Sequence, residues 1–175
     1  MDPSQRVDAR TAIENLLYRY AERIDAGDFA GVGELFSRGR ILDPAGRVIG
    51  TGAAEVEAIY VRSTRRYADG TPGTQHLTTN VILEFADDGR SARARSRFTV
   101  MQALEDFPLQ CIITGHYEDR FARDDGGGWH FVERQMKPTL VGDLSRHLNH
   151  RLPEGPENGP STDSPDDASG DRPLG

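Results

Sequence analysis

An acidic residue, Asp25, stands at a position that helix formation does not favour. Apolar residues recur along one helical face from Ile13 to Ile24, and Asp25 follows in the last turn, shortly before Gly27. Glycine commonly ends helices, so the carboxylate lies against the negative end of the helix dipole, at a cost of about 0.3–1 kcal/mol. Because side chains that break a local rule often serve function, Asp25 is a candidate proton-transfer group.

Tyrosines form a second set of candidates. Tyr20 belongs to the apolar stripe of the first helix, and its hydroxyl could donate a hydrogen bond to a substrate carbonyl or enolate oxygen. Tyr60, in an expected third helix, and Tyr117, on an expected long strand, could line the same pocket. The alternative for each is a core tyrosine with a local hydrogen-bond partner, which is the commoner case for Tyr60 and Tyr117.

The sequence predicts that helices and then long strands position these side chains. A second helix is expected at about 29–36 with Asp28 as its N-cap, followed by a small hairpin around 43–46 and a third helix that Thr51 could cap. The strands are expected at about 75–86, 91–104, 109–123 and 128–140. Helices followed by a strand meander predict an α+β fold, with three helices packed on one face of a curved antiparallel sheet.

Alternation along the strands predicts which side chains face inward. In the second strand, arginines at 93, 95 and 97 alternate with an inward set that includes Ser96, Phe98 and Gln102, so these three are candidate lining residues. In the first strand the apolar set falls on odd positions from Leu77, whereas His76 is even. We therefore expect His76 to reach the pocket only if the strand bends or bulges near its start, or if the apolar face meets a partner subunit.

Composition restricts the class of protein. With 175 residues the chain has room for one domain with a real core, and its net charge of −7 argues against nucleic acid as the main partner. The single cysteine, Cys111, cannot form an internal disulfide, which favours a reducing compartment. No signal core and no run of membrane-spanning length is visible, so a cytoplasmic protein that is not membrane-bound is expected.

The last segment differs in composition from the rest of the chain. Residues 151–175 hold six acidic residues against two arginines, together with five of the ten prolines. This composition predicts a disordered acidic tail, and it leaves residues 1–150 as the folded domain.

Several short motifs together resemble a known family. They are Tyr18-Arg19-Tyr20-Ala21-Glu22-Arg23-Ile24-Asp25-Ala26-Gly27-Asp28, Leu35-Phe36, Thr74-Gln75-His76 and Gly128-Trp129-His130-Phe131. The pattern resembles the SnoaL-like branch of the nuclear transport factor 2-like superfamily over roughly residues 8–142. This resemblance implies a cone-shaped α+β barrel around a deep apolar pocket, and a homo-oligomer, either a dimer or a trimer.

Within that family the pattern is similar to scytalone dehydratase and bile-acid 7-alpha-dehydratase. The resemblance implies an acid at Asp25 and a histidine at His76 in the active site, and the second enzyme also implies a tyrosine at Tyr20. Those enzymes carry further polar groups on the second long strand, where this chain has Val100, Met101 and Gln102. No histidine or aspartate stands there, so the reaction itself stays open.

An Asp25–His76 pair is the central hypothesis. A carboxylate that orients an imidazole fixes its tautomer and raises its basicity, so the pair could remove a proton beside a carbonyl and return it to a leaving hydroxyl. The alternative is structural, with Asp25 as a cap and His76 as a satisfied histidine at a strand end. Lys137, the sole lysine, lies near the place where bile-acid dehydratase has a basic residue, and it is a candidate substrate-binding residue. An exposed lysine at a strand end is the commoner case.

No metal or cofactor is expected. His76, His116 and His130 are widely spaced, and His147 and His150 stand beside the tail without a recognised ligand pattern. The sequence and the resemblance together predict a cofactor-free lyase or isomerase, of dehydratase or cyclase type, for an apolar cyclic polyketide- or steroid-like substrate. The alternatives are a structural subunit, such as the small subunit of a ring-hydroxylating oxygenase, and a protein that only binds an apolar ligand.

Overall fold

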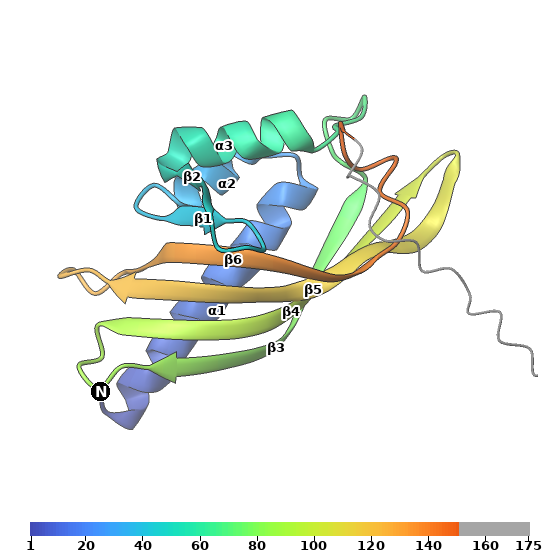
Figure 1. The fold of residues 1–175 in the computed structure, drawn as a ribbon. Coiled ribbons are helices and arrows are strands. Elements are labelled where there is room, and N and C mark those ends of the chain that lie inside the picture. Colours follow the sequence, from blue (N-terminus) through green and yellow to red (C-terminus); the bar gives the residue numbers. More distant parts are fainter. Residues whose placement is uncertain (151–175) are drawn as a thin grey trace, which may run out of the picture.

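Three helices pack against a six-stranded sheet in the computed structural model, which describes residues 1–150 (Figure 1). In chain order the elements are α1 (Pro3–Asp25), α2 (Phe29–Leu35), β1 (Arg40–Leu42), β2 (Val48–Thr51), α3 (Gly52–Ser63), β3 (Thr74–Phe85), β4 (Ser91–Leu104), β5 (Phe107–Arg123) and β6 (Trp129–Val141). The predicted α+β cone is confirmed. The predicted acidic tail, 151–175, lies outside the described residues.

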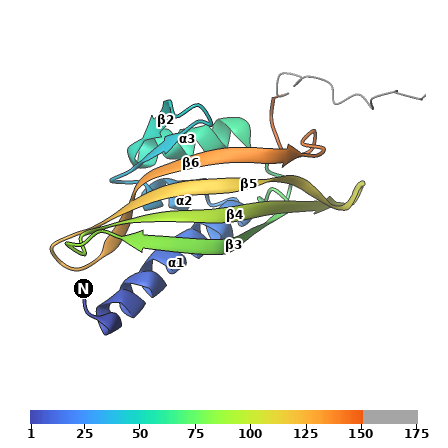
Figure 2. The same ribbon diagram turned by 60° about the horizontal axis from the view of Figure 1, so that its bottom comes forward.

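The sheet is open and mixed, with the strand order β2-β1-β6-β5-β4-β3. The four long strands form the antiparallel meander that the sequence predicts, and they curve together across the helices (Figure 2). The predicted curved antiparallel sheet describes the four long strands, whereas the short strand β1 runs parallel to β6 and makes the whole sheet mixed. The chain enters β1 from the helical layer and not through a tight hairpin, so no short turn forces the two strands to be antiparallel.

Helix α1 buries the apolar stripe that the sequence predicts and places Asp25 in its last turn. Its buried residues are Ala9, Ile13, Leu17, Tyr20, Ala21 and Ile24. Gly27, two residues after the end of the helix, has a φ of +71°, and a Cβ there would lie 2.2 Å from the carbonyl oxygen of Gly70. A residue with a side chain would therefore be strained and would also clash, so glycine ends the helix at this point.

The caps of the shorter helices agree with the predictions in part. The Asp28 carboxylate caps α2 by accepting a hydrogen bond from the Gly31 backbone N–H at 2.8 Å. Thr51 is the N-cap residue of α3, but its side chain makes no capping hydrogen bond. Instead, the Glu55 carboxylate accepts a hydrogen bond from the Thr51 backbone N–H at 2.9 Å, so the first turn of α3 is stabilised from within.

A bulge in β3 reverses the alternation of its side chains. The register with β4 shifts between Thr79 and Ile82, and Asn80 has a φ of +53°. Before the bulge the even residue His76 faces inward and Leu77 is exposed, and after it the odd positions face inward. The expected bulge is therefore present, although it lies in the middle of the strand and not near its start. It explains how His76 and the apolar odd positions beyond it share one face.

The left-handed conformation of Asn80 gives a prediction about stability. Asn80 is exposed, so a substitution there changes the backbone preference with little effect on packing. We expect Asn80→Val to lower the free energy of unfolding by about 1–3 kcal/mol, because β-branched residues disfavour positive φ. Asn80→Gly should leave it close to the wild-type value. Urea denaturation measures both, and equal stability of the two variants would contradict the assigned conformation.

Candidate active site

An apolar cavity of about 340 Å³ lies between the inner face of the sheet and the helices. Its walls come from α1, α3, the strands β3 to β6, the β1–β2 hairpin and the segment that follows β6. Most of its lining side chains are apolar, including Ile24, Val100, Ile113 and Leu144, and a few polar groups converge among them. A cavity of this size and character is typical of a site for a small molecule.

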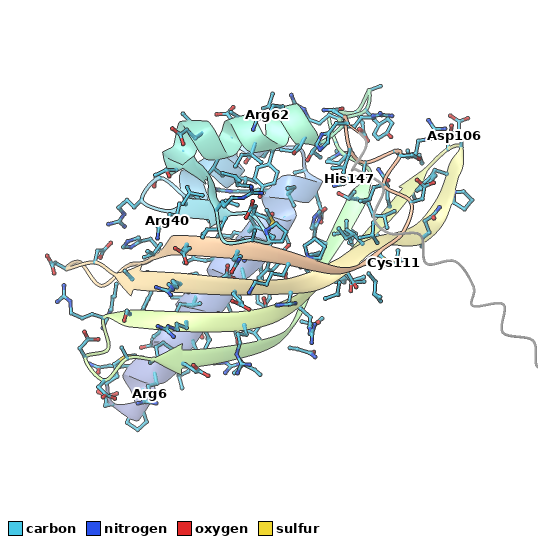
Figure 3. All side chains as sticks on the ribbon, in the orientation of Figure 1. Arg6, Arg40, Arg62, Asp106, Cys111 and His147 are labelled. Carbon is cyan, nitrogen blue, oxygen red and sulfur yellow. The ribbon has the colours of Figure 1, made fainter. Side chains whose placement is uncertain are left out.

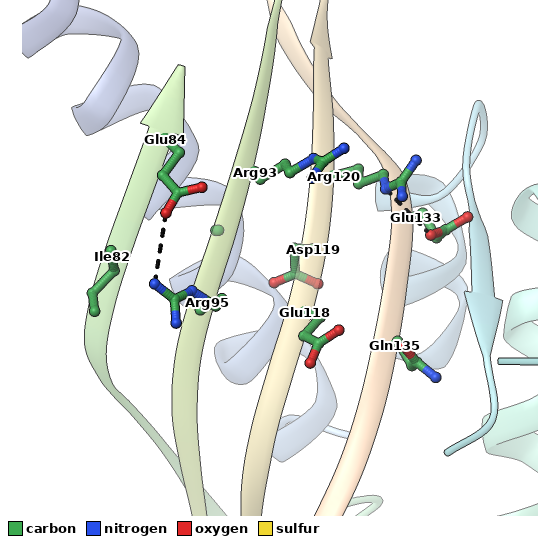
Figure 4. A pocket seen from close by; sticks show the side chains of 10 residues that line it. Ile82, Glu84, Arg93, Arg95, Glu118, Asp119, Arg120, Glu133 and Gln135 are labelled. Atoms are coloured by element: carbon green, nitrogen blue, oxygen red, sulfur yellow. Dashed lines mark ion pairs between the residues drawn. The ribbon is translucent and has the colours of Figure 1, made fainter. Parts of the chain in front are cut away.

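A second hollow, of about 240 Å³, lies on the outer face of the sheet and is charged (Figure 4). It includes the Arg95–Glu84 and Arg120–Glu133 ion pairs, each with an N–O distance of 3.6 Å. The arginine side chains there are well exposed, at 63% for Arg95 and 58% for Arg120. This is the solvated face that the alternation of β4 predicts, and water screens its charges.

Asp25 and His76 meet at the edge of the apolar cavity. The Asp25 Oδ1 atom lies 2.5 Å from His76 Nδ1 and accepts a hydrogen bond from the Thr74 hydroxyl at 2.8 Å. The Oδ2 atom accepts from the His76 backbone N–H at 2.7 Å. The side chains are mostly buried, with exposed fractions of 8% for His76 and 20% for Asp25. An ionised carboxylate cannot donate, so Nδ1 carries the proton and the lone pair of neutral His76 is on Nε2.

Tyrosine hydroxyls form a second polar group in the cavity. The Tyr20 and Tyr60 hydroxyls lie 2.8 Å apart, and Tyr20 packs edge-on against Tyr117 with ring centroids 6.0 Å apart. Burial raises the pKa of Tyr20, although the nearby Arg134 charge acts in the opposite direction. Burial also raises the pKa of Tyr60 and Tyr117 well above the usual range. All three phenols are therefore protonated near neutral pH and can donate hydrogen bonds.

A buried ion pair supports these tyrosines. Arg134 binds Asp119 through two hydrogen bonds, Nε to Oδ1 at 2.8 Å and Nη2 to Oδ2 at 2.9 Å, and both side chains have no exposed surface. The Arg134 guanidinium lies 4.2 Å from the centre of the Tyr20 ring and 4.0 Å from that of Tyr117. These two ring contacts and the two hydrogen bonds to Asp119 together hold the guanidinium in place.

Sequence reasoning missed this pair, although one signal was present. Asp119 shares the odd, inward positions of β5 with Tyr117 and Phe121. Burial raises the pKa of Asp119, and the adjacent Arg134 charge opposes that shift. A buried acid on an apolar face needs a basic partner, and Arg134 on the next strand provides it.

Three of the remaining candidates line the cavity, and a fourth lies on the same face of the sheet without lining it. Tyr60, Phe98 and Tyr117 line it directly, together with Tyr20. Ser96 is buried on the same face of the sheet but is not among the lining residues.

Two candidates are used elsewhere. Gln102 is buried, and its amide donates to the carbonyl oxygens of Pro72 at 3.0 Å and Arg146 at 3.3 Å. It therefore links two loops and does not line the cavity. Lys137 lies on the outer face, where its Nζ donates to Glu118 at 2.8 Å. Its neighbour Met136 faces the cavity, so strand alternation turns Lys137 away from it. The expectation that Lys137 binds substrate is therefore corrected.

His147 is a cavity residue that the sequence analysis set aside because it stands next to the tail. It is 9% exposed, and it lies on the segment after β6, beside the end of α3 (Figure 3). Burial lowers the pKa of His147 to about 4, and the Asp25 carboxylate opposes that shift. Its position depends on tertiary hydrogen bonds, so spacing in the sequence gave no signal for it.

Residues 1–150 show neither a metal site nor a membrane-spanning helix. No group of three or more histidine, cysteine, aspartate or glutamate side chains there is arranged to hold a metal ion. No helix in this range is both long and apolar enough to span a membrane.

Known structures share this fold. A variant of Rv3472, a protein of unknown function from Mycobacterium tuberculosis, is 25% identical with a TM-score of 0.64, over 81% of this chain and 78% of that chain. A candidate scytalone dehydratase from Novosphingobium aromaticivorans is 20% identical with a TM-score of 0.64, over 81% of this chain and 91% of that chain. ActVI-ORFA from Streptomyces coelicolor is 18% identical with a TM-score of 0.60, over 75% and 97% of the two chains.

Comparison of the sequence itself gives the family. No curated protein matches the chain. Residues 5–135, however, match the SnoaL-like domain, and this range includes most of α1, the whole of β3 to β5 and both Asp25 and His76. The chain therefore belongs to the SnoaL-like domain family of the nuclear transport factor 2-like fold.

Proposed function

We propose that this protein is a cofactor-free lyase or isomerase, of dehydratase or cyclase type, that acts on an apolar cyclic substrate in the cavity. The observation that carries the proposal is the 2.5 Å contact between Asp25 and His76 at the edge of an apolar cavity. A carboxylate on Nδ1 makes the opposite nitrogen a better proton acceptor, and apolar walls exclude water that would compete.

The reaction would begin with removal of a proton from a carbon beside a carbonyl. His76 Nε2 takes the proton, and the imidazolium that forms is stabilised by the Asp25 carboxylate. Negative charge develops on the carbonyl oxygen, where the Tyr20 hydroxyl donates a hydrogen bond, with the Tyr60 hydroxyl 2.8 Å behind it. In a dehydration, His76 then returns the proton to the leaving hydroxyl, so one imidazole serves both steps.

The lining also indicates the charge of the substrate. Among residues 1–150, no lysine or arginine lines the cavity, whereas Asp43 does and Asp25 borders it through His76. A carboxylate or phosphate on the substrate would enter this site without a cationic partner, at a desolvation cost. The proposal is therefore for an uncharged substrate, such as a polyketide- or steroid-like ring system.

The description of one structural relative agrees with this class of reaction. The protein from Novosphingobium aromaticivorans is described as a candidate scytalone dehydratase, and that relation supports lyase chemistry by analogy of fold. The expected homo-oligomer and the cytoplasmic location stay predictions. The competing functions are a structural subunit and a ligand carrier. Neither would catalyse proton transfer, which deuterium exchange measures.

The Asp25–His76 pair is tested by proton exchange. In D₂O, the protein should accelerate deuterium incorporation beside the carbonyl of 2-tetralone, a neutral bicyclic ketone, measured by mass spectrometry. His76→Ala and Asp25→Asn should each lower the rate about 10²–10⁴-fold, the usual contribution of a positioned base. Asp25→Asn retains an oxygen for the His76 backbone N–H, so its thermal unfolding should change little.

The matched control is His116→Ala, which removes a histidine from the outer face of the sheet, where its Nε2 lies 3.7 Å from Glu118. This variant should exchange deuterium at the wild-type rate. Wild-type rates in both His76→Ala and Asp25→Asn would end the proposed mechanism. Binding of 2-tetralone with no exchange above the solvent rate would favour a ligand carrier.

The role of Tyr20 as a hydrogen-bond donor is tested by its phenylalanine variant, with a second tyrosine of α1 as the control. Tyr20→Phe should lower the exchange rate on the order of 100-fold, because the donor to the developing oxyanion is lost while the ring remains. Tyr18→Phe, at a 43% exposed position of α1, should have no effect. Equal rates in the two variants would show that Tyr20 is a core residue and does not act on the substrate.

A further inference from the structure

The segment Gly142–His150 is fastened across one side of the cavity by main-chain hydrogen bonds. The Arg65 N–H donates to the His147 carbonyl at 2.8 Å, and the Asn149 N–H donates to the Ser63 carbonyl at 2.9 Å. Two side chains hold the Arg146 carbonyl, the Tyr67 hydroxyl at 2.5 Å and the Gln102 amide at 3.3 Å. Bonds on both sides of His147 fix its backbone, so the direction of its side chain is set by the fold.

The His147 side chain lines the cavity and has no hydrogen-bond partner among the described residues. The residue is 9% exposed, and its Nδ1 atom has no accessible surface. Buried polar groups in folded proteins nearly always have a partner, so an imidazole without one needs an explanation, and a polar atom of a molecule bound in the cavity would provide it.

Two of the three imidazoles that line the cavity, those of His76 and His147, differ in their surroundings. His76 has a carboxylate on Nδ1 and can therefore hold a positive charge when it takes a proton. His147 has no carboxylate bound to its ring, and burial lowers its pKa to about 4. His147 is therefore neutral at physiological pH, with one N–H donor and one lone pair, which suits a hydroxyl or carbonyl group.

We propose that His147 is a ligand-binding residue that hydrogen-bonds an oxygen atom of an uncharged, mainly apolar molecule in the cavity. Leu144 and Leu148, on the same segment, contact the apolar part of that molecule. This inference rests on the proposed function in one respect, because both treat this cavity as the substrate site. His147 would orient the substrate, and His76 would transfer the proton.

The experiment measures binding without turnover. Isothermal titration compares 2-naphthol with naphthalene, which has the same rings and no oxygen, and with 2-naphthoate, which is charged. The wild-type protein should bind 2-naphthol most tightly and 2-naphthoate most weakly. His147→Phe should lower the affinity for 2-naphthol about tenfold, as expected for loss of one buried hydrogen bond, and leave naphthalene binding unchanged. His147→Gln, which keeps a donor and an acceptor, should retain most of the preference.

A spectroscopic measurement on the wild-type protein avoids any folding defect of the variants. With ¹⁵N-labelled histidine, 2-naphthol should shift a His147 ring nitrogen, and naphthalene should not. His116→Phe is the matched control, and it should keep the wild-type selectivity in titration. The proposal is wrong if the wild-type protein does not distinguish 2-naphthol from naphthalene, or if His147→Phe preserves that distinction.

The two proposals can fail separately. Asp25→Asn should keep the 2-naphthol selectivity because it does not alter His147, even though deuterium exchange is lost. A protein that selects 2-naphthol through His147 but never exchanges protons would refute the proposed reaction and support the binding role. If deuterium exchange depends on His76 but the selectivity for 2-naphthol does not depend on His147, the proposed reaction is supported and the binding role of His147 is refuted.

Discussion

The carboxylate of Asp25 joins the helical layer to the sheet at the point where the candidate chemistry lies. Its two oxygens accept hydrogen bonds from the Thr74 hydroxyl, the His76 backbone and the His76 ring. A carboxylate at the end of a helix is disfavoured by the dipole, but three donors from β3 compensate for that cost. The same three bonds place the start of β3 beside the end of α1, and they hold the imidazole in one orientation. Structural and chemical roles therefore coincide in this one side chain.

The inner wall of the cavity depends on a second buried polar contact. Arg134 pairs with Asp119 and packs against the rings of Tyr20 and Tyr117. Such a pair is not by itself a source of stability, because taking both charges out of water is expensive. Its effect here is on geometry, since a guanidinium held by two hydrogen bonds gives both rings one surface to pack on. Its positive charge also stabilises negative charge near the Tyr20 hydroxyl, where the proposed oxyanion would form.

Much of the architecture could be predicted from periodicity alone. The apolar stripe of α1, the positions of the four long strands and the solvated arginines of β4 follow directly from repeats of 3.6 and 2. The direction of His76 could not be predicted, because it depends on whether the strand bulges. Asn80 was the available signal, since asparagine adopts positive φ more readily than other side-chain-bearing residues.

The remaining differences in the site have two physical causes. Lys137 was associated with the pocket through resemblance, whereas alternation with Met136 turns it to the outer face. His147 is held in the cavity by bonds to residues about 80 positions earlier, such as the one from Arg65. No local pattern in the sequence encodes a contact over that separation. The spacing of residues could therefore predict the site residues on the helices and strands, but not His147.

The bulge at Asn80 has an effect beyond the candidate site. β3 is the outermost strand of the sheet on its side, and a long regular strand in that place would offer a continuous row of unpaired backbone groups to another chain. The left-handed residue interrupts that row between Thr79 and Ile82, and leaves two shorter stretches of regular strand. The irregularity that directs an imidazole inward thus also protects the protein against edge-to-edge aggregation.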